Sequence, residues 1–420
     1  GISLRNPDTG VFMKYHLAGA YDSNIALLLT TGNDRRQSYH RLAEILRRTE
    51  VRGKELATNL DFHYGLVNWF IGQNINARPE TRFMLPYLTA IGKLKEAADQ
   101  LELKFCFDTI RARHLATCRP ELQADVSGVL DRKQSLLLRP LERLFAEPHA
   151  LSGWLSRNRH RFVVSADRVS FTENPIEILA DMYHFLNMDF VAGKPAAYMI
   201  WDHDNSLLQT ALDFYATLKE RLKVEHYKDL LDALGGSNPE AIPPAQWNAV
   251  KAAHKGFQAG TEILSVLPHI AVQTGFYDLK VRDDLSIEIP AELAEEDLQR
   301  RMAKVLAPPP ALKSDELVAV SGGMFYAREA PGAEAFVVEG SHFNEGDALY
   351  IVEVMKMFNK VYAPFAGTVD ETLVSTDGVI IKKGQPLFKV TPDEQFIEVT
   401  DEEVEAERRR KTEEFLVAIP

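Results

Sequence analysis

An internal repeat near the C-terminal end constrains the fold more than any other feature of the chain. Five residues recur at a constant offset of 38 positions (378 − 340, 384 − 346): Gly340, Gly346, Leu349, Tyr350 and Val352 are matched by Gly378, Gly384, Leu387, Phe388 and Val390. Residues 317–392 are also rich in β-forming residues, with turn residues every few positions. A fixed offset in so short a segment predicts two similar β halves, related by a pseudo-two-fold axis, that close one small flattened sandwich.

Lys356 lies in the connection between these two halves. The first half ends in the run Glu353-Val354-Met355-Lys356-Met357, after which a hairpin must lead into the second half. A hairpin tip keeps the ammonium group accessible, and the strands on either side fix its backbone. The neighbouring methionines are flexible and weakly polar, so a partner surface can pack on them. This arrangement predicts a lysine that a second enzyme acylates.

The run resembles the Glu-Ala-Met-Lys-Met signature of biotin carboxyl carrier domains, with Val354 in place of the usual alanine. The resemblance implies that biotin is attached covalently to Lys356 and that Glu353, Met355 and Met357 form the cofactor-binding signature around it. One alternative is an accidental Met-Lys-Met in a surface hairpin, although Glu-x-Met-Lys-Met arises only about once per million positions from average residue usage. A lipoyl carrier is the other alternative, but its tip typically reads Asp-Lys-Ala.

The resemblance extends over about residues 317–392. The segments 321–326 (SGGMFY) and 328–336 (REAPGAEAF) resemble a strand and the inserted thumb of the bacterial acetyl-CoA carboxylase carrier. Most other biotin carriers lack that insertion. The resemblance therefore implies an acyl-CoA carboxylase, and it disfavours a pyruvate or other oxo-acid carboxylase.

Residues 1–94 are expected to form an α/β segment. The apolar run 24–30 (NIALLLT) predicts a buried strand, Asp34 predicts a helix cap, and a helix face follows. That face consists of Tyr39, Leu42, Ala43 and Leu46. The segments 20–25, 32–35 and 58–60 resemble the last part of a biotin carboxylase subunit, although a generic βα unit is the alternative. Phe12 follows Gly10-Val11 where that family has a biotin-contacting arginine, and no ATP-grasp motif is found, so no carboxylase active-site residue is assigned.

Residues 95–305 have mostly helical periodicity and predict a helical interaction domain. Asn174-Pro175 with Glu177 predicts a helix start. The other predicted elements are a helix through Leu208, Leu212, Tyr215, Leu218 and Leu222 that ends near Gly235-Gly236, a helix from Ala245 to Leu267 that stops at Pro268, and a strand over Arg161–Ser165. The helix that starts at Asn174-Pro175 has its apolar face at Ile176, Leu179, Tyr183 and Leu186. No catalytic constellation is recognised in this domain.

Two weaker candidate sites lie in the first half of the chain. The run 201–205 (WDHDN) offers oxygen ligands for a cation, but a capped loop before a helix is the simpler interpretation, because no further ligand has calcium-loop spacing. The clusters 34–36 (DRR) and Arg157, Arg159 and Arg161 offer charge for CoA phosphates, although small basic groups are usually solvated surface.

Two segments flank the predicted sandwich. The linker 306–316 contains three consecutive prolines and favours an extended conformation of about 3.1 Å per residue, so it spans roughly 30 Å as a semi-rigid tether. The tail 393–420 has an acidic run before a basic one and predicts a charged, solvated surface helix without a specific partner. The chain is thus expected to be a multidomain α+β protein.

Composition limits the possible partners and the compartment. The net charge of −12 argues against nucleic acid, and two cysteines, Cys106 and Cys118, exclude a disulfide framework and a Cys-rich metal site. No apolar run has the roughly 18–20 residues that cross a bilayer, and no secretory signal is recognised, so a cytoplasmic protein is expected. The first residue is not Met, which indicates a fragment or processed piece.

The resemblance implies a two-step reaction. A biotin carboxylase uses ATP and Mg in a part of the complex outside this chain, and a carboxyltransferase passes the carboxyl group to an acyl-CoA. The chain would carry carboxybiotin between them, within an oligomeric complex, after loading by biotin protein ligase. Whether it has enzyme activity alone is left open. The remaining alternatives are the equivalent part of an oxo-acid carboxylase and a non-enzymatic assembly protein with a vestigial biotinyl domain.

Overall fold

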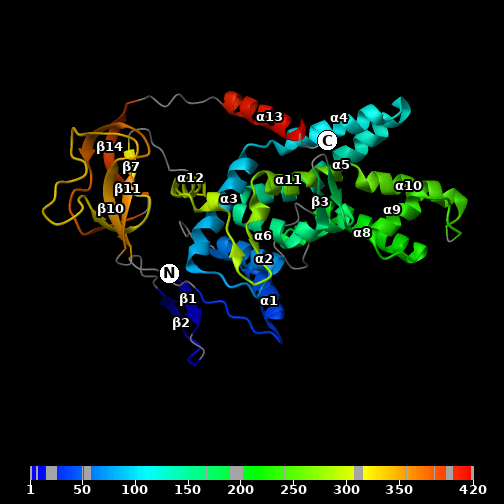
Figure 1. Ribbon diagram of the computed structural model, residues 1–420, viewed down its shortest axis with the longest axis horizontal. Helices are drawn as coiled ribbons and strands as arrows, with labels where there is room; N and C mark the ends of the chain where they lie inside the picture. The colour runs from blue at the N-terminus through cyan, green and yellow to red at the C-terminus, as the bar shows by residue number, and fades with distance from the viewer. Residues whose placement is uncertain are drawn as a thin grey trace. The chain divides into compact units, whose positions relative to one another are not determined.

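A computed structural model describes most of the 420-residue chain. The described residues are 2–5, 8–15, 26–49, 51, 58–165, 168–189, 202–240, 242–306, 316–354, 357–382, 384–393 and 401–417. The chain divides into two compact units, which Figure 1 shows with labelled elements. One unit comprises residues 1–28 and 308–400 and is built of strands, whereas the other comprises 29–307 and 401–420 and is mainly helical.

The C-terminal part of the first unit is a two-layer β structure. Its strands are β7 (Glu316–Val318), β8 (Gly323–Tyr326), β9 (His342–Phe343), β10 (Ala348–Val354), β11 (Met357–Tyr362), β12 (Gly367–Thr372), β13 (Val379–Ile381) and β14 (Pro386–Pro392). They form two four-stranded antiparallel sheets with the orders β11-β10-β8-β13 and β7-β14-β12-β9. Phe325, Tyr350, Val369, Leu387 and Phe388 are buried in a shared core. The predicted all-β fold of this region is confirmed.

The predicted repeat is also confirmed, because equivalent positions have the same conformation. β10 and β14 are the same seven-residue strand displaced by 38 positions, and each belongs to a different sheet. Gly340 and Gly378 have φ values of 77° and 78°, and Gly346 and Gly384 have values of 87° and 79°. These left-handed turns suit glycine, which has no Cβ to clash there. The glycines of the repeat therefore mark its turns.

The N-terminal segment differs from the predicted α/β unit. A hairpin of β1 (Ile2–Arg5) and β2 (Phe12–Tyr15) is present, but no strand forms over the described residues 26–30. Leu27 and Leu29 are 81% and 78% exposed, so the prediction of a buried strand is wrong there. The physical reason is that no described strand pairs with this run, and a lone strand has neither ladder hydrogen bonds nor a covering layer. Residues 24 and 25 of the run lie outside the described residues.

Thirteen helices make up most of the second unit within the described ranges. They are α1 (Arg35–Arg48), α2 (Leu60–Gln73), α3 (Met84–Asp99), α4 (Leu103–Thr117), α5 (Gln123–Ala146), α6 (Pro148–Asn158), α7 (Pro175–Phe185), α8 (Asp202–Leu222), α9 (Tyr227–Gly235), α10 (Pro244–Gln258), α11 (Val266–Gln273), α12 (Glu296–Leu306) and α13 (Asp401–Val417). Two short hairpins accompany them, β3 (Phe162–Val164) with β4 (Val169–Phe171) and β5 (Lys280–Val281) with β6 (Ile287–Glu288). The helical character and the strand near Arg161–Ser165 were predicted.

Two predicted helix starts are confirmed by their caps. Asp34 Oδ1 accepts the Gln37 N–H at 2.7 Å before α1, and Asn174 Oδ1 accepts the Ile176 N–H at 3.1 Å before α7. These side chains satisfy amide groups that have no partner inside a first turn. The predicted apolar faces also point inward: Ala43, Leu46, Ile176, Leu179, Tyr183 and Leu186 are all buried.

Two predicted helix ends are wrong. The helix through Leu208 stops at Leu222, because Lys223 takes a left-handed φ of 55°, and α9 is a separate helix. α10 stops at Gln258 because Gly260 takes a φ of 83°, and Pro268 lies in the first turn of α11, where its missing N–H costs nothing. Apolar residues continue at helical spacing across both breaks, so the sequence pattern did not indicate where the helices end.

α2 and α6 pack with their backbones unusually close. A Cβ built on Gly65 would lie 2.3 Å from the carbonyl oxygen of His149, and one on Gly72 would lie 2.3 Å from the carbonyl carbon of Ser156. The two glycines are seven residues apart, so they share one face of α2. This close approach positions α6 and the segment that follows it.

The tail helix α13 packs on the helical unit through its C-terminal half. Thr412 is fully buried, and its Oγ1 accepts the Glu102 N–H at 3.0 Å. Phe415 and Leu416 are buried, whereas Val404 is 46% exposed. The predicted charged helix is confirmed, and its apolar side chains also cover the helical core.

Candidate functional site

The predicted lysine site lies at the β10–β11 hairpin. The two strands pair from Ala348 with Tyr362 through to Val354 with Met357. The pairing of Val354 with Met357 brackets a connection of two residues, Met355 and Lys356, which lie outside the described residues. The signature residues on both flanks therefore belong to one antiparallel ladder, whose end is fixed by main-chain hydrogen bonds.

Glu353 is the signature residue whose side chain the structure describes. Its Oε2 accepts a hydrogen bond from the Tyr326 hydroxyl at 2.7 Å. This hydrogen bond raises the pKa of Tyr326, because it favours the protonated phenol. The Tyr326 ring also lies 5.7 Å from the ring of Phe358, which pairs with Glu353 across the hairpin. Strands β8, β10 and β11 thus fix the carboxylate close to the hairpin tip.

Residues 328–336, which resemble the thumb insertion, fold back onto the same sheet. Arg328 and Ala335 form a β-bridge, and Arg328 Nη1 donates to the Ala333 carbonyl at 3.0 Å. Arg328 also pairs with Asp377 at 2.8 Å. On the other side, Lys360 of β11 pairs with Glu329 at 2.7 Å. The insertion is therefore connected directly to the strand that follows Lys356.

Large apolar side chains remain exposed on the sheet that carries the hairpin. Phe358 and Tyr362 on β11 are 61% and 56% exposed, and Ile380 on β13 is 68% exposed. Their exposure contrasts with the closed core beneath them and provides apolar surface close to the hairpin. Phe358 and Tyr362 lie on one edge strand of the sheet and Ile380 on the other, so they provide separate exposed apolar groups.

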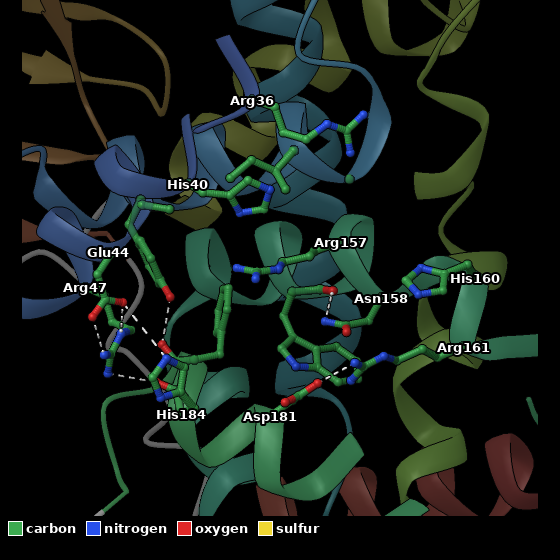
Figure 2. Close-up of a pocket in the computed structure, with 16 residues that line it drawn as sticks. Arg36, His40, Glu44, Arg47, Arg157, Asn158, His160, Arg161, Asp181 and His184 are labelled. Atoms are coloured by element: carbon green, nitrogen blue, oxygen red, sulfur yellow. Dashed lines mark hydrogen bonds and ion pairs between the residues drawn. The ribbon is translucent and has the colours of Figure 1, made fainter. Parts of the chain in front are cut away.

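The sequence did not reveal a polar cavity of about 490 Å³ in the helical unit. One face of α1 lines it with residues at helical spacing, and α2, α6, α7 and the turn after α6 complete the wall (Figure 2). The polar lining residues are Arg36, His40, Glu44, Arg47, Tyr64, Arg157, Asn158, His160, Arg161, Asp181 and His184. The structure thus places Arg36, from the segment 34–36, in the same cavity as Arg157 and Arg161 from the second basic cluster. Arg35 and Arg159 do not line the cavity.

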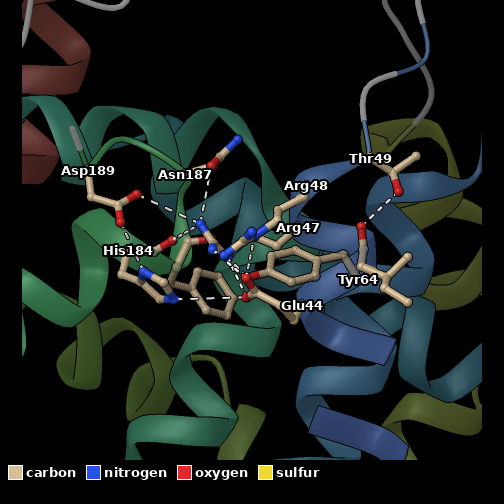
Figure 3. A network of polar contacts seen from close by, with 10 residues as sticks. Glu44, Arg47, Arg48, Thr49, Tyr64, His184, Asn187 and Asp189 are labelled. Atoms are coloured by element: carbon tan, nitrogen blue, oxygen red, sulfur yellow. Dashed lines mark hydrogen bonds and ion pairs between the residues drawn. The ribbon is translucent and has the colours of Figure 1, made fainter. Parts of the chain in front are cut away.

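An ion-pair network includes Glu44, Arg47 and His184 of the cavity lining (Figure 3). Arg47 pairs with Glu44 at 2.8 Å and with Asp189 at 3.7 Å, and its side chain is only 5% exposed. His184 Nδ1 contacts Asp189 at 3.0 Å. These contacts join α1 to α7 and lower the pKa of Glu44, chiefly through its hydrogen bond with Arg47. The network holds both helices in place around the cavity.

The other sequence candidates have structural roles. Asp204, from the candidate cation loop, is buried and accepts hydrogen bonds from Ser135 at 2.7 Å and Arg139 at 3.0 Å. Burial raises the pKa of the Cys106 thiol to about 12, so it is poorly suited to act as a nucleophile. No group of three potential metal ligands occurs among the described residues. Within the same ranges, every helix is too short or too polar to cross a membrane.

Comparisons with known proteins agree on the β unit. Residues 320–390 match the family model described as "Biotin-requiring enzyme". The biotin carboxyl carrier protein of acetyl-CoA carboxylase from Nostoc sp. is 36% identical over 81 residues, which cover 19% of this chain and 44% of the relative. The protein of the same name from Chlamydia trachomatis serovar D is 32% identical over 123 residues, which cover 27% of this chain and 71% of the relative.

These matches cover only part of the proteins compared. The chain spans less than half the length of the Nostoc relative and of two other carrier proteins, from Haemophilus influenzae and Chlamydia muridarum. Among solved structures, a single-chain, multi-domain long-chain acyl-CoA carboxylase matches 29% of this chain and 14% of its own, at 24% identity and a TM-score of 0.17. That likeness is too low to support an argument about fold or function.

Proposed function

The chain belongs to the family of biotin carboxyl carrier proteins of acetyl-CoA carboxylase, and from that premise we propose that it is the carrier and scaffold portion of a biotin-dependent acyl-CoA carboxylase. Lys356 is the proposed attachment point of biotin. The observation that carries the proposal is the β10–β11 register, which brackets the lysine of the signature in a two-residue connection. Biotin supplies, when bound, a ureido nitrogen that accepts and releases a carboxyl group.

The chain's own residues have three proposed roles around that lysine. Glu353, Met355 and Met357 form the signature that biotin protein ligase recognises, with Glu353 held by Tyr326. The exposed side chains of Phe358 and Tyr362 provide apolar surface for partner enzymes. The ordered insertion at 328–336 favours the acetyl-CoA type of carrier over that of oxo-acid carboxylases, because the resemblance assigns the insertion to the former.

Tethering is the proposed physical contribution of the rest of the chain. A cofactor on a tethered domain meets each active site at a high effective concentration, provided that the connection spans the gap. Residues 306–316 are the proposed semi-rigid linker, and the helical unit is the proposed docking scaffold for biotin carboxylase and carboxyltransferase. ATP and Mg would act on the carboxylase, outside this chain.

Modification of the purified chain tests the attachment site. The full chain co-expressed with biotin protein ligase should gain the mass of one biotin, and a Lys356→Ala variant should gain none. Lys382→Ala is the matched control, because Lys382 is an exposed lysine of the same sandwich and should leave biotin incorporation unchanged. Biotin on any other lysine, or its retention in Lys356→Ala, would show that the assignment is wrong. Carboxylation of an acyl-CoA by the assembled enzyme should be lost only in the first variant.

A further inference from the structure

The cavity between α1, α6 and α7 has more positive charge than its own carboxylates can balance. Four arginines line it, against two carboxylates, although the whole chain has a net charge of −12. Outside the lining, Asp189 pairs with Arg47 and Glu173 pairs with Arg161, so the unbalanced charge is that of Arg36 and Arg157. Both lining carboxylates are already bound by arginines: Glu44 by Arg47 and Arg48, and Asp181 by Arg161. Arg36 and Arg157 have no carboxylate partner in the described part of the chain. A local excess of positive charge of this kind attracts an anion.

His40 lies in the same electrostatic environment. Burial lowers the pKa of His40, and the positive charges of Arg157 and Arg36 lower it further. Figure 2 shows His40 and Arg157 as neighbours on facing elements, with Asp181 and His184 farther along the cavity. Arg157 is oriented by a hydrogen bond to Asn68 Oδ1 at 3.2 Å, and its guanidinium group has no other hydrogen bond within the described ranges. A charged donor and an imidazole whose protonation is disfavoured therefore lie side by side, both on exposed residues.

The wall of the cavity also contains buried donors that lack acceptors. Trp154 is fully buried, and its Nε1 has no hydrogen-bond partner among the described residues. Arg161 Nη1 is likewise buried without an acceptor within the described ranges, although Arg161 Nη2 binds Asp181. Both nitrogens have almost no accessible surface, so they lie behind the cavity wall and are not contacts for a ligand in it. The Arg161 guanidinium group is held there by Asp181 and Glu173. Trp154 and Arg161 themselves line this cavity.

We propose that this cavity binds the diphosphate group of a nucleotide-type ligand, with Arg36, His40 and Arg157 as the anion-binding side chains. A diphosphate has many acceptor oxygens and at least two negative charges, which match the charges of Arg36 and Arg157. The volume of about 490 Å³ lies within the range of small-molecule sites, so it also accommodates an organic portion beside Tyr64 and Phe185. The proposal involves the helical unit alone and does not depend on the carrier function.

Calorimetric titration of the full chain with pyrophosphate, ADP and CoA tests this proposal. All three should bind, because they share the diphosphate, and their order of affinity distinguishes a nucleoside diphosphate from a CoA ligand. Arg157→Gln should weaken binding about tenfold or more, since it removes a charged hydrogen-bond donor but keeps a polar group for Asn68. Arg35→Gln is the matched control, because it removes the same charge next to Arg36 and outside the cavity.

A second readout is specific to this site. Addition of pyrophosphate should raise the pKa of His40, measured by NMR, because bound negative charge offsets that of Arg36 and Arg157. Absence of binding for all three ligands at millimolar concentration, or equal weakening in Arg157→Gln and Arg35→Gln, would overturn the proposal. Binding of pyrophosphate without ADP or CoA would overturn the nucleotide-type assignment. Thermal unfolding of each variant shows whether it is folded.

Discussion

Tyr326 connects a single hydroxyl group to the proposed modification signature. Its hydrogen bond to Glu353 restricts the carboxylate that precedes the proposed biotin site by three residues. We predict that Tyr326→Phe lowers the rate of biotin incorporation a few-fold, because the Glu353 side chain gains rotamer freedom that the ligase must remove on binding. The loss of stability should be small, because Tyr326 is only partly buried.

Ligase kinetics on purified full-length variants measure this effect. Tyr362→Phe is the control, because Tyr362 lies on β11 of the same sheet and is 56% exposed. It loses the same hydroxyl group and should be modified at the rate of the natural chain. Equal rates for all three proteins would contradict a positioning role for Tyr326.

The contact between His114 and Glu262 makes the stability of the helical unit depend on pH. The hydrogen bond from His114 to Glu262, 3.3 Å away, raises the pKa of His114 above its usual 6.5. The folded state therefore binds this proton more tightly than the unfolded state. The resulting stability is fully present below about pH 6.5 and is lost as pH rises through the elevated pKa.

The variant Glu262→Gln should move the pKa of His114 back toward 6.5 in an NMR titration. Its free energy of unfolding should fall below that of the natural chain by up to about 1 kcal/mol in mildly acidic solution, since the pair is partly exposed. The difference should shrink in mildly alkaline solution. A difference that stays constant with pH would mean that the pair does not supply the stability.

At the element scale, the contact between α2 and α6 depends on two glycines. We predict that Gly65→Ala destabilises the helical unit by about 3 kcal/mol or more, because the new methyl group would meet the His149 backbone, which cannot rotate away. Gly256→Ala is the control: it lies in α10 with open space around it and should be neutral or stabilising by up to about 1 kcal/mol. Denaturant unfolding of both variants measures this, and equal stabilities would show that the helices can separate without cost.

The elements that sequence predicted well are those whose signals are local. The offset of 38 residues locates equivalent strands and turns, because each glycine of the repeat occupies a left-handed turn. The caps at Asp34 and Asn174 are likewise local, since each satisfies an amide group of its own first turn. The break after α8 was missed because Lys223, a residue with no preference for positive φ, makes the turn. The prediction of a strand over residues 24–30 is wrong at residues 26–30, because strand formation depends on a partner elsewhere in the chain.

The candidate sites divide in the same way. The signature around Lys356 is contiguous, so it is visible in the sequence, and its flanks lie in one ladder. The cavity joins Arg36, Arg157 and Asp181, which are more than 20 residues apart, and only the packing of α1, α6 and α7 brings them together. A stripe at 36, 40, 44 and 47 on one helix face was the available signal, but such polar stripes usually face solvent.

At the scale of the whole molecule, the helical unit holds both ends of the β sandwich. The chain leaves α12 at Leu306 for β7, and it returns after β14 to α13, which is packed in the helical unit. Seven residues separate Asp393 from α13, and they span at most roughly 25 Å at full extension. The proposed travel of the carrier is therefore limited by the return connection as well as by the proline-rich one.

Detachment of α13 tests this second anchor. Phe415→Asp should release the helix, because burial of a Phe side chain contributes about 1.5–3 kcal/mol and a buried unpaired carboxylate adds a further cost. Hydrogen exchange of the α13 amides should then become fast, while those of β10 and β14 stay protected, since the two units have separate cores. Val404→Asp introduces the same group at an exposed position of the same helix and should leave the exchange unchanged. Biotin incorporation should be equal in both variants, whereas carboxyl transfer in the assembled enzyme should fall only in Phe415→Asp, because a sandwich held at one end searches a larger volume and meets each active site less often.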